Sequence, residues 1–121
     1  MTVATVGSFY VEQVRNITVV CFTVSALGDQ NYEAVSEELL ELVSQVTANG
    51  PIQVVVELSA VHRIDGLGLA MLQAFDDSIE DAGGTVILCR LTPGVSSAIR
   101  EAGLSCNFDI RSTRGDAMWS F

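Results

Sequence analysis

The residues with the clearest chemical potential lie between Ser59 and Gly68, in the segment Ser-Ala-Val-His-Arg-Ile-Asp-Gly-Leu-Gly. His62 is the only histidine of the chain, and Asp65 follows it closely, so a hydrolase triad could be built from these two and either Ser59 or a cysteine. A lone loop histidine more often has a structural or solvent role. We therefore expect that the chain is not an enzyme.

Cofactor and metal motifs are incomplete. Gly66-Leu67-Gly68 stands where a dinucleotide fingerprint would begin, but Met71 occupies the place of its third glycine. A phosphate-binding loop requires a lysine, which this sequence lacks. One histidine and three scattered cysteines do not have the spacing of a metal site. We expect neither a cofactor nor a metal.

The charge balance bears on the kind of partner. Fifteen carboxylates stand against six arginines in 121 residues, and the net charge of −9 repels nucleic-acid phosphates and anionic lipids. Basic protein surfaces are the more natural partners, although such charge can also serve only to keep an apolar chain soluble. The apolar runs are too short for direct membrane insertion. An odd set of three cysteines and a start without signal-peptide features predict reduced, mostly buried thiols in a cytoplasmic protein.

The elements that must position the central segment follow one another as a single domain over residues 1–121. A β-hairpin is expected first, with Arg15-Asn16 as its turn, and later strands alternate with helices that carry apolar stripes. The predicted strands are Phe9 to Val14, Ile17 to Val24, Gln53 to Leu58, Thr85 to Cys89 and a short one near Asn107 to Ile110. The predicted helices are Asn31 to Thr47, Leu67 to Asp81, one from Thr92-Pro93 to Gly103, and a short one beginning at Ser112 or Thr113.

This order predicts an α/β fold with a mixed, mostly parallel sheet, an N-terminal hairpin and helices covering the sheet. Asn49-Gly50-Pro51 should stop the first long helix. Asp65 should N-cap the second, which is predicted to carry Leu67, Met71, Phe75 and Ile79 on one face. Glu57, in an apolar strand, needs a partner such as Arg63 or Arg90. We expect Trp119 and Phe121 to pack on the domain.

The stretch from Val54 to Leu72 resembles the STAS domain, the family of anti-sigma-factor antagonists, stressosome subunits and transporter-associated domains. The family pattern is an apolar strand ending in Asp-Leu-Ser, then Asp-Ser-Ser-Gly-Leu-Gly and a helix. This chain has Glu57-Leu58-Ser59, then Asp65-Gly66-Leu67-Gly68-Leu69-Ala70. The resemblance covers about Phe9 to Met118 and includes Gly83-Gly84, Thr92-Pro93 and Ala102-Gly103-Leu104. It is weak at Ser25 to Asn31, where the usual Gly-Glu-Leu-Asp is not recognisable.

The resemblance implies that a protein partner, an anti-sigma factor or kinase-type regulator, docks at the start of the second long helix. In antagonists of this family the partner phosphorylates the serine after the loop aspartate, and binding is lost. Gly66 occupies that position here, and Leu67 replaces the next serine. Substitute acceptors could be Ser59, Thr92, Ser96 and Ser97, although capping and turn roles are commoner for such residues.

Two interpretations remain open. In the first, the chain is a non-catalytic regulatory domain that binds a protein in a signalling pathway of transcription. Its predicted docking residues are Ser59, His62, Arg63, Asp65, Gly66, Leu67 and Gly68. In the second, the chain is a self-associating scaffold of the stressosome kind, including a homodimer, or a transporter-linked subunit, and uses its apolar surface and Trp119.

Overall fold

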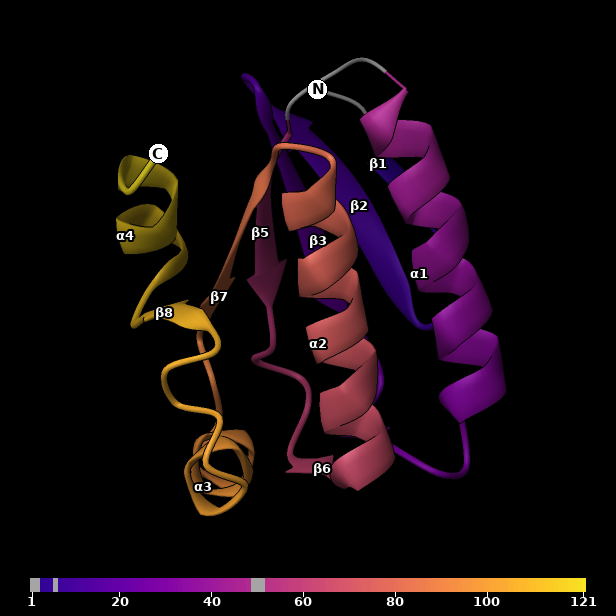
Figure 1. Ribbon diagram of the computed structural model, residues 1–121, viewed down its shortest axis with the longest axis vertical. Coiled ribbons are helices and arrows are strands. Elements are labelled where there is room, and N and C mark those ends of the chain that lie inside the picture. Colours follow the sequence, from indigo (N-terminus) through magenta and orange to yellow (C-terminus); the bar gives the residue numbers. More distant parts are fainter. Residues whose placement is uncertain (1–2, 6, 49–51) are drawn as a thin grey trace.

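A six-stranded sheet forms the centre of the computed structural model, which describes residues 3–5, 7–48 and 52–121 (Figure 1). Its strand order is β1-β2-β3-β5-β7-β8. The first two pairings are antiparallel, and β3, β5, β7 and β8 run parallel. These strands are β1 (Val3–Thr5), β2 (Phe9–Val14), β3 (Ile17–Phe22), β5 (Gln53–Glu57), β7 (Thr85–Cys89) and β8 (Asp109–Arg111). The predicted α/β fold with an N-terminal hairpin is confirmed.

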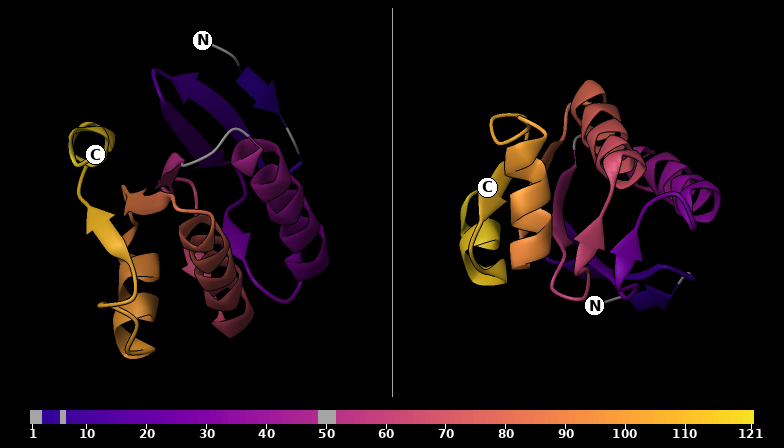
Figure 2. Two further views of the ribbon diagram at one scale, coloured as in Figure 1. Left: turned by 45° about the horizontal axis from the view of Figure 1, so that its top comes forward. Right: turned by 90° about the horizontal axis from the view of Figure 1, so that it is seen from below.

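The helices lie on both faces of this sheet. The long helices α1 (Tyr32–Thr47) and α2 (Gly66–Asp81) run side by side on one face, with their N-termini at the same end (Figures 1 and 2). The short helix α4 (Arg114–Trp119) packs on the opposite face against β5, β7 and β8. Helix α3 (Pro93–Glu101) begins after its N-cap Thr92, as predicted, and lies beside β6 (Arg63–Ile64).

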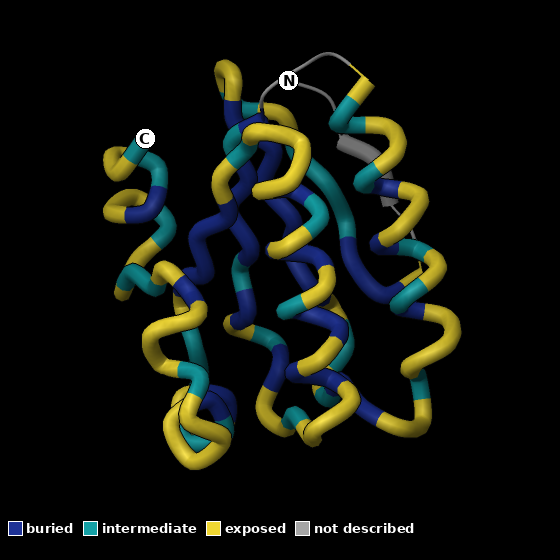
Figure 3. The backbone as a smooth tube through the Cα atoms, in the orientation of Figure 1, coloured by how far each residue is buried: buried dark blue, intermediate teal, exposed yellow. Residues whose placement is uncertain are grey.

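The core is divided by the sheet into two apolar clusters, because successive side chains of a strand point to opposite faces. Val54 and Val56 of β5 belong to the larger cluster under α1 and α2. Val55 belongs to the smaller cluster, together with Ala117 of α4 and Phe121. Burial on both faces explains the continuous apolar runs of β3 and β5 (Figure 3).

The structure also contains strands that were not predicted. The pair Gly28-Asp29 predicts a loop over Ser25 to Gln30, but this stretch contains β4 (Ala26–Leu27), which pairs in parallel with β6. Strand β1 adds an outer edge to the hairpin, and β3 ends at Phe22 rather than Val24. Strands of two or three residues are too short to show an alternating pattern, so their pairing is set by tertiary contacts. The predicted stop at Asn49-Gly50-Pro51 lies outside the described residues.

The last helix, α4, begins where it was predicted to begin, but the burial of Trp119 differs from the prediction. Its N-cap is Thr113, one of the two residues predicted to begin it, and its side chain accepts a hydrogen bond from the Asp116 backbone N–H. Phe121 packs against the smaller cluster, but Trp119 is 86% exposed. Its predicted packing on the domain is therefore wrong, because α4 covers the sheet with Ala117 and Met118 and leaves the Trp119 side chain in solvent.

Glu57 lies on the face covered by α4 and is paired with arginines from two elements. Arg90 Nε is 3.9 Å from Glu57 Oε1, and Arg114 Nη1 of α4 is 3.7 Å from Oε2. Arg114 also bonds Glu12 of β2. Arg90 was one of the two predicted partners. Arg63 lies elsewhere, exposed on β6, and the second partner, Arg114, is far away in sequence.

We expect Arg114→Ala to loosen α4 from the sheet and to lower the free energy of unfolding by about 1 to 2 kcal/mol, because Glu12 loses a charged hydrogen-bonding partner and Glu57 loses one of its two ion-pair partners. Cys21 and Cys89 are buried free thiols, and burial raises the pKa of Cys89 to about 11. Alkylation of these two cysteines should therefore be slow in the wild-type protein and faster in the variant. Exposed Cys106 should react at the same rate in both. Arg100→Ala, at an exposed position of α3, is the control, and unchanged labelling in Arg114→Ala would contradict this role.

Helix α2 contains a buried carboxyl that the apolar pattern did not reveal. Asp76 is only 2% exposed, and its Oδ1 has no hydrogen-bond partner among the described residues. Burial, together with the neighbouring carboxyl groups of Glu80, Asp77 and Asp109, raises the pKa of Asp76 to about 7. The folded protein thus binds a proton here that the unfolded chain releases near pH 4.

Stability should consequently fall as pH rises from about 4 to 7, since the folded state holds more protons than the unfolded state across this window. Asp76→Asn removes the ionisation and should stabilise the protein at pH 8 by on the order of 2 kcal/mol, with little effect near pH 4. Urea unfolding at pH 4 and pH 8 measures the difference. Asp77→Asn, one residue along on the exposed side of α2, is the control. Equal effects of the two substitutions would show that burial of Asp76 is not the cause.

Candidate protein-docking site

The loop between β5 and α2 is held in place by neighbouring backbone. The His62 and Arg63 backbone N–H groups both donate to the Ser25 carbonyl oxygen, at N···O distances of 2.8 and 3.2 Å. The Thr92 hydroxyl donates to the Val61 carbonyl oxygen at 2.6 Å. Pairing of β4 with β6 continues this attachment as far as Ile64. The loop therefore presents a fixed surface.

Asp65 connects this loop to both α2 and the β4–α1 loop. Its Oδ1 accepts a hydrogen bond from the Gly68 N–H at 3.0 Å, which confirms the predicted N-cap. Its Oδ2 accepts a second bond from the Asp29 N–H, also at 3.0 Å. These backbone donors hold the pKa of the Asp65 carboxyl below its usual value. Asp65 thus fixes the start of α2 against a loop 36 residues earlier in the chain.

Two glycines allow this close approach. A Cβ at Gly68 would lie 2.3 Å from the Leu27 carbonyl oxygen, and a Cβ at Gly28 would lie 2.3 Å from Asp65 Oδ2. The contribution of Gly28 and Asp29 was missed, since Gly28-Asp29 was read only as a loop signal. That signal was present in the sequence, but the partner at Asp65 could not be identified without the β4–β6 pairing.

Gly66 and Leu67 are the exposed residues at the start of α2. Nothing lies within 4 Å of a Cβ built at Gly66, so a serine would fit there without a clash. Leu67 is 41% exposed, whereas Met71, Phe75 and Ile79 are buried. Leu67 has the helical spacing of these three residues but is exposed, because the first turn of α2 extends beyond the part of the helix that packs beside α1 (Figure 3). The apolar side chain of Leu67 is therefore exposed at the end of the molecule where α2 begins.

The other predicted site residues divide into two groups. His62, Arg63 and Asp65 are exposed on the same loop, next to Gly66 and Leu67, while Gly68 is buried beneath them. Ser59 is exposed, but its hydroxyl donates to Glu57 Oε1 at 3.0 Å, on the sheet face that α4 covers. We call His62, Arg63, Asp65, Gly66 and Leu67 the docking edge. Ser59 lies at the margin of the docking edge, and its hydroxyl is bonded to Glu57, which is ion-paired with Arg90 and Arg114.

A hydrolase triad is not assembled by these residues. Ser59 is bonded to Glu57, and both Asp65 oxygens accept backbone N–H groups. Thr92, considered as a substitute phosphosite, is the N-cap of α3, and Ser97 accepts a bond from Arg100. Within the described residues, no three His, Cys, Asp or Glu side chains are grouped as metal ligands. No helix in the part of the chain that the structure describes combines the length and apolarity needed to cross a membrane.

Solved structures with the same arrangement include an anti-sigma factor antagonist from Mycobacterium paratuberculosis, at 23% identity and a TM-score of 0.76, with 93% of this chain and 92% of that chain covered. The Bacillus cell fate determinant SpoIIAA in its phosphorylated form is 17% identical, with a TM-score of 0.64 and coverages of 93% and 98%. The murine anion transporter Slc26a9 is 16% identical, with a TM-score of 0.75. The match covers 97% of this chain and 21% of the transporter.

No match was found among curated protein sequences. Because these sequence identities are low, the structural likenesses establish only the fold. The family model of the STAS domain matches residues 10–117, nearly the whole chain, including the β5 strand, the docking edge and α2. The chain belongs to the STAS domain family.

Proposed function

We propose that this chain is a non-catalytic regulatory domain that binds a protein partner through the docking edge and acts in the cytoplasm in the control of transcription. The observation that carries the proposal is the exposed pair Gly66-Leu67 at the N-terminus of α2, fixed by the two backbone bonds of Asp65. A rigid edge with an apolar side chain at its centre loses little entropy when a partner covers it.

The proposed partner is a kinase-type anti-sigma factor. Support comes from the solved relatives that are described as anti-sigma factor antagonists. SpoIIAA is described in unphosphorylated and phosphorylated forms. In this chain Gly66, at the family's acceptor position, has no hydroxyl to accept a phosphoryl group. Binding here should therefore not be switched off by the partner's kinase activity.

This proposal can be tested with the purified kinase-type anti-sigma factors of the source organism, incubated with the chain, Mg²⁺ and ATP. We expect intact-mass spectrometry to show no phosphate on the wild-type chain, and binding to be equal before and after ATP. Gly66→Ser should fold normally, because the site is open, and should gain a phosphate and lose binding. Phosphate on Ser59 of the wild-type chain, or release of the complex by ATP, would contradict the proposal.

A second candidate function is self-association as a scaffold or as a transporter-linked domain. It is favoured by Trp119, which is 86% exposed on α4, on the face opposite α1 and α2. Exposed tryptophan is frequent at protein interfaces. Sedimentation of the wild-type chain and of Trp119→Ser separates the two functions. A wild-type monomer at high concentration excludes self-association as the main role, and a dimer that Trp119→Ser dissociates would establish it.

A further inference from the structure

A shallow apolar groove runs between α1 and α2, on the face away from the sheet. Its volume is about 150 Å³, smaller than the several hundred Å³ of typical small-molecule sites, so it suits an inserted side chain better than a separate ligand. The groove is lined mostly by apolar residues of both helices: Tyr32, Leu39, Leu40, Ala70, Met71 and Phe75. Among these lining residues, Leu40 lies at the edge of the groove, and it is 64% exposed.

The groove leads to the docking edge. Leu67 precedes Ala70 and Met71 by three and four residues, so it lies on the same side of α2 as these two groove residues. Both helices begin at the end of the molecule where the docking edge lies (Figure 1). The apolar strip is therefore continuous from Leu67 into the groove.

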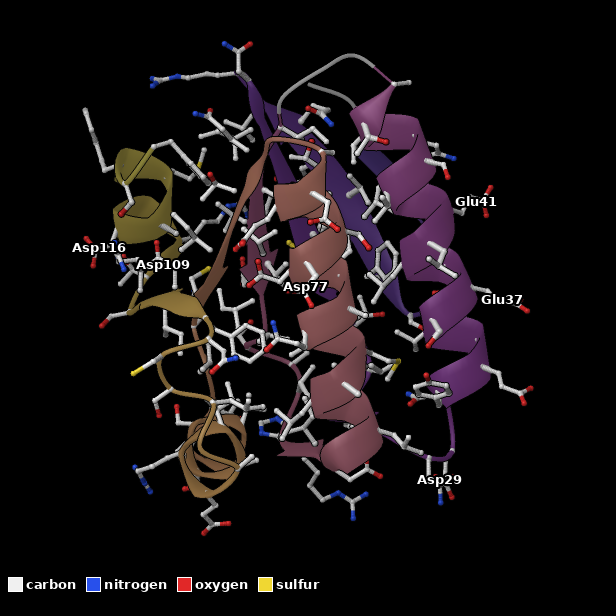
Figure 4. The ribbon with its side chains drawn as sticks, in the orientation of Figure 1. Asp29, Glu37, Glu41, Asp77, Asp109 and Asp116 are labelled. Carbon is white, nitrogen blue, oxygen red and sulfur yellow. The ribbon has the colours of Figure 1, made fainter. Side chains whose placement is uncertain are left out.

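The surroundings of the groove are acidic. Helices α1 and α2 contain four carboxylates each and no lysine or arginine. Of these, Glu37 and Glu41 project from the outer side of α1, and Asp77 projects from the front of α2 (Figure 4). Each is exposed and lies within one turn of a groove residue, Leu40 for the glutamates and Ala74 for Asp77. A partner must therefore combine apolar anchors with flanking positive charge.

We propose that this groove binds a basic amphipathic helix of a protein partner. Parallel helices of 16 residues present a furrow about 24 Å long, which is the length of a helix of similar size. A helix lying there would insert apolar side chains at i, i+3 or i+4 and i+7, with its lysines and arginines facing the carboxylates on either side. A second copy of this chain would bring like charges together, and anionic lipid or nucleic acid would be repelled.

A synthetic peptide of 18 residues provides the probe, with leucines at helical spacing and lysines at the other positions. Fluorescence anisotropy should detect binding to the wild-type chain. Leu40→Asp should weaken it at least about tenfold, because an apolar contact is lost from the groove. Trp119→Asp is the matched control, since it makes the same kind of change at an exposed residue of α4, and it should alter affinity by less than about twofold.

Two further peptides separate specific docking from simple charge attraction. A peptide of the same composition with scrambled leucine positions should bind at least about tenfold more weakly, and one with glutamate in place of lysine should not bind. The proposal is overturned if the wild-type chain does not bind the first peptide, if the scrambled peptide binds equally well, or if Leu40→Asp and Trp119→Asp have equal effects. No anti-sigma factor enters this experiment, so its outcome is independent of the proposed function.

Discussion

Gly68→Ala, beneath the docking edge, is expected to lower the free energy of unfolding by about 3 kcal/mol, the largest stability effect predicted here. The added Cβ would lie 2.3 Å from the Leu27 carbonyl oxygen and 2.6 Å from Ile64 Cγ1. The carbonyl cannot move away freely, because it accepts a hydrogen bond from the Asp65 N–H and belongs to the β4–β6 pair. Relief of the clash must therefore separate α2 from β4.

The sign of this effect is informative, because helix propensity alone predicts the opposite. Alanine is favoured over glycine in a helix by roughly 1 kcal/mol. Gly66→Ala is the matched control two residues earlier, where nothing lies within 4 Å of the new Cβ, and it should leave stability unchanged or slightly higher. Chemical denaturation of both variants measures the contrast. Equal stability of Gly68→Ala and Gly66→Ala would show that α2 does not approach β4 as closely as described.

Leu67→Glu is expected to weaken partner binding at least about tenfold while leaving the fold intact. The leucine is 41% exposed, so few folded-state contacts are lost, and a carboxylate in the first turn suits the positive end of the α2 dipole. At an interface the same change replaces apolar contact with a charge that has to be desolvated. Calorimetric titration with the anti-sigma factor measures the loss.

Leu67→Met is the control for this experiment, because it preserves an apolar side chain of similar volume and should keep affinity within about threefold. Gly66→Asp, which places a negative charge at the start of α2, should weaken binding as Leu67→Glu does. If Leu67→Glu and Leu67→Met bind equally well, Leu67 lies outside the interface.

The elements with strong local signals could be predicted from the sequence. The hairpin turn, the four helices and the central parallel strands follow from apolar periodicity and from glycine and proline positions. Asp65 was identified as an N-cap from its place just before an apolar helix, and the structure confirms this role. Arg90 was named, together with Arg63, as a candidate partner of Glu57, and the structure places Arg90 beside this carboxylate.

The features that were missed depend on contacts between distant segments. The β4–β6 pair has two residues in each strand, so its stability comes from packing around Gly68 and from Asp65 rather than from a strand pattern. Arg114 reaches Glu57 only because α4 folds back over β5. Asp76 stands at an inward position of α2, where an apolar residue would normally be expected. Trp119 was expected to pack on the domain because large apolar residues usually lie in the interior, but it is exposed.

Hydrogen–deuterium exchange of the chain with and without the proposed anti-sigma factor tests the central claim most directly, since it locates the covered surface without any substitution. Backbone amides from His62 to Ala70, the segment that includes the docking edge, should exchange more slowly in the complex, and those of α4 should not change. Protection confined to α4 and β8, with the docking edge exchanging as in the free chain, would contradict the account.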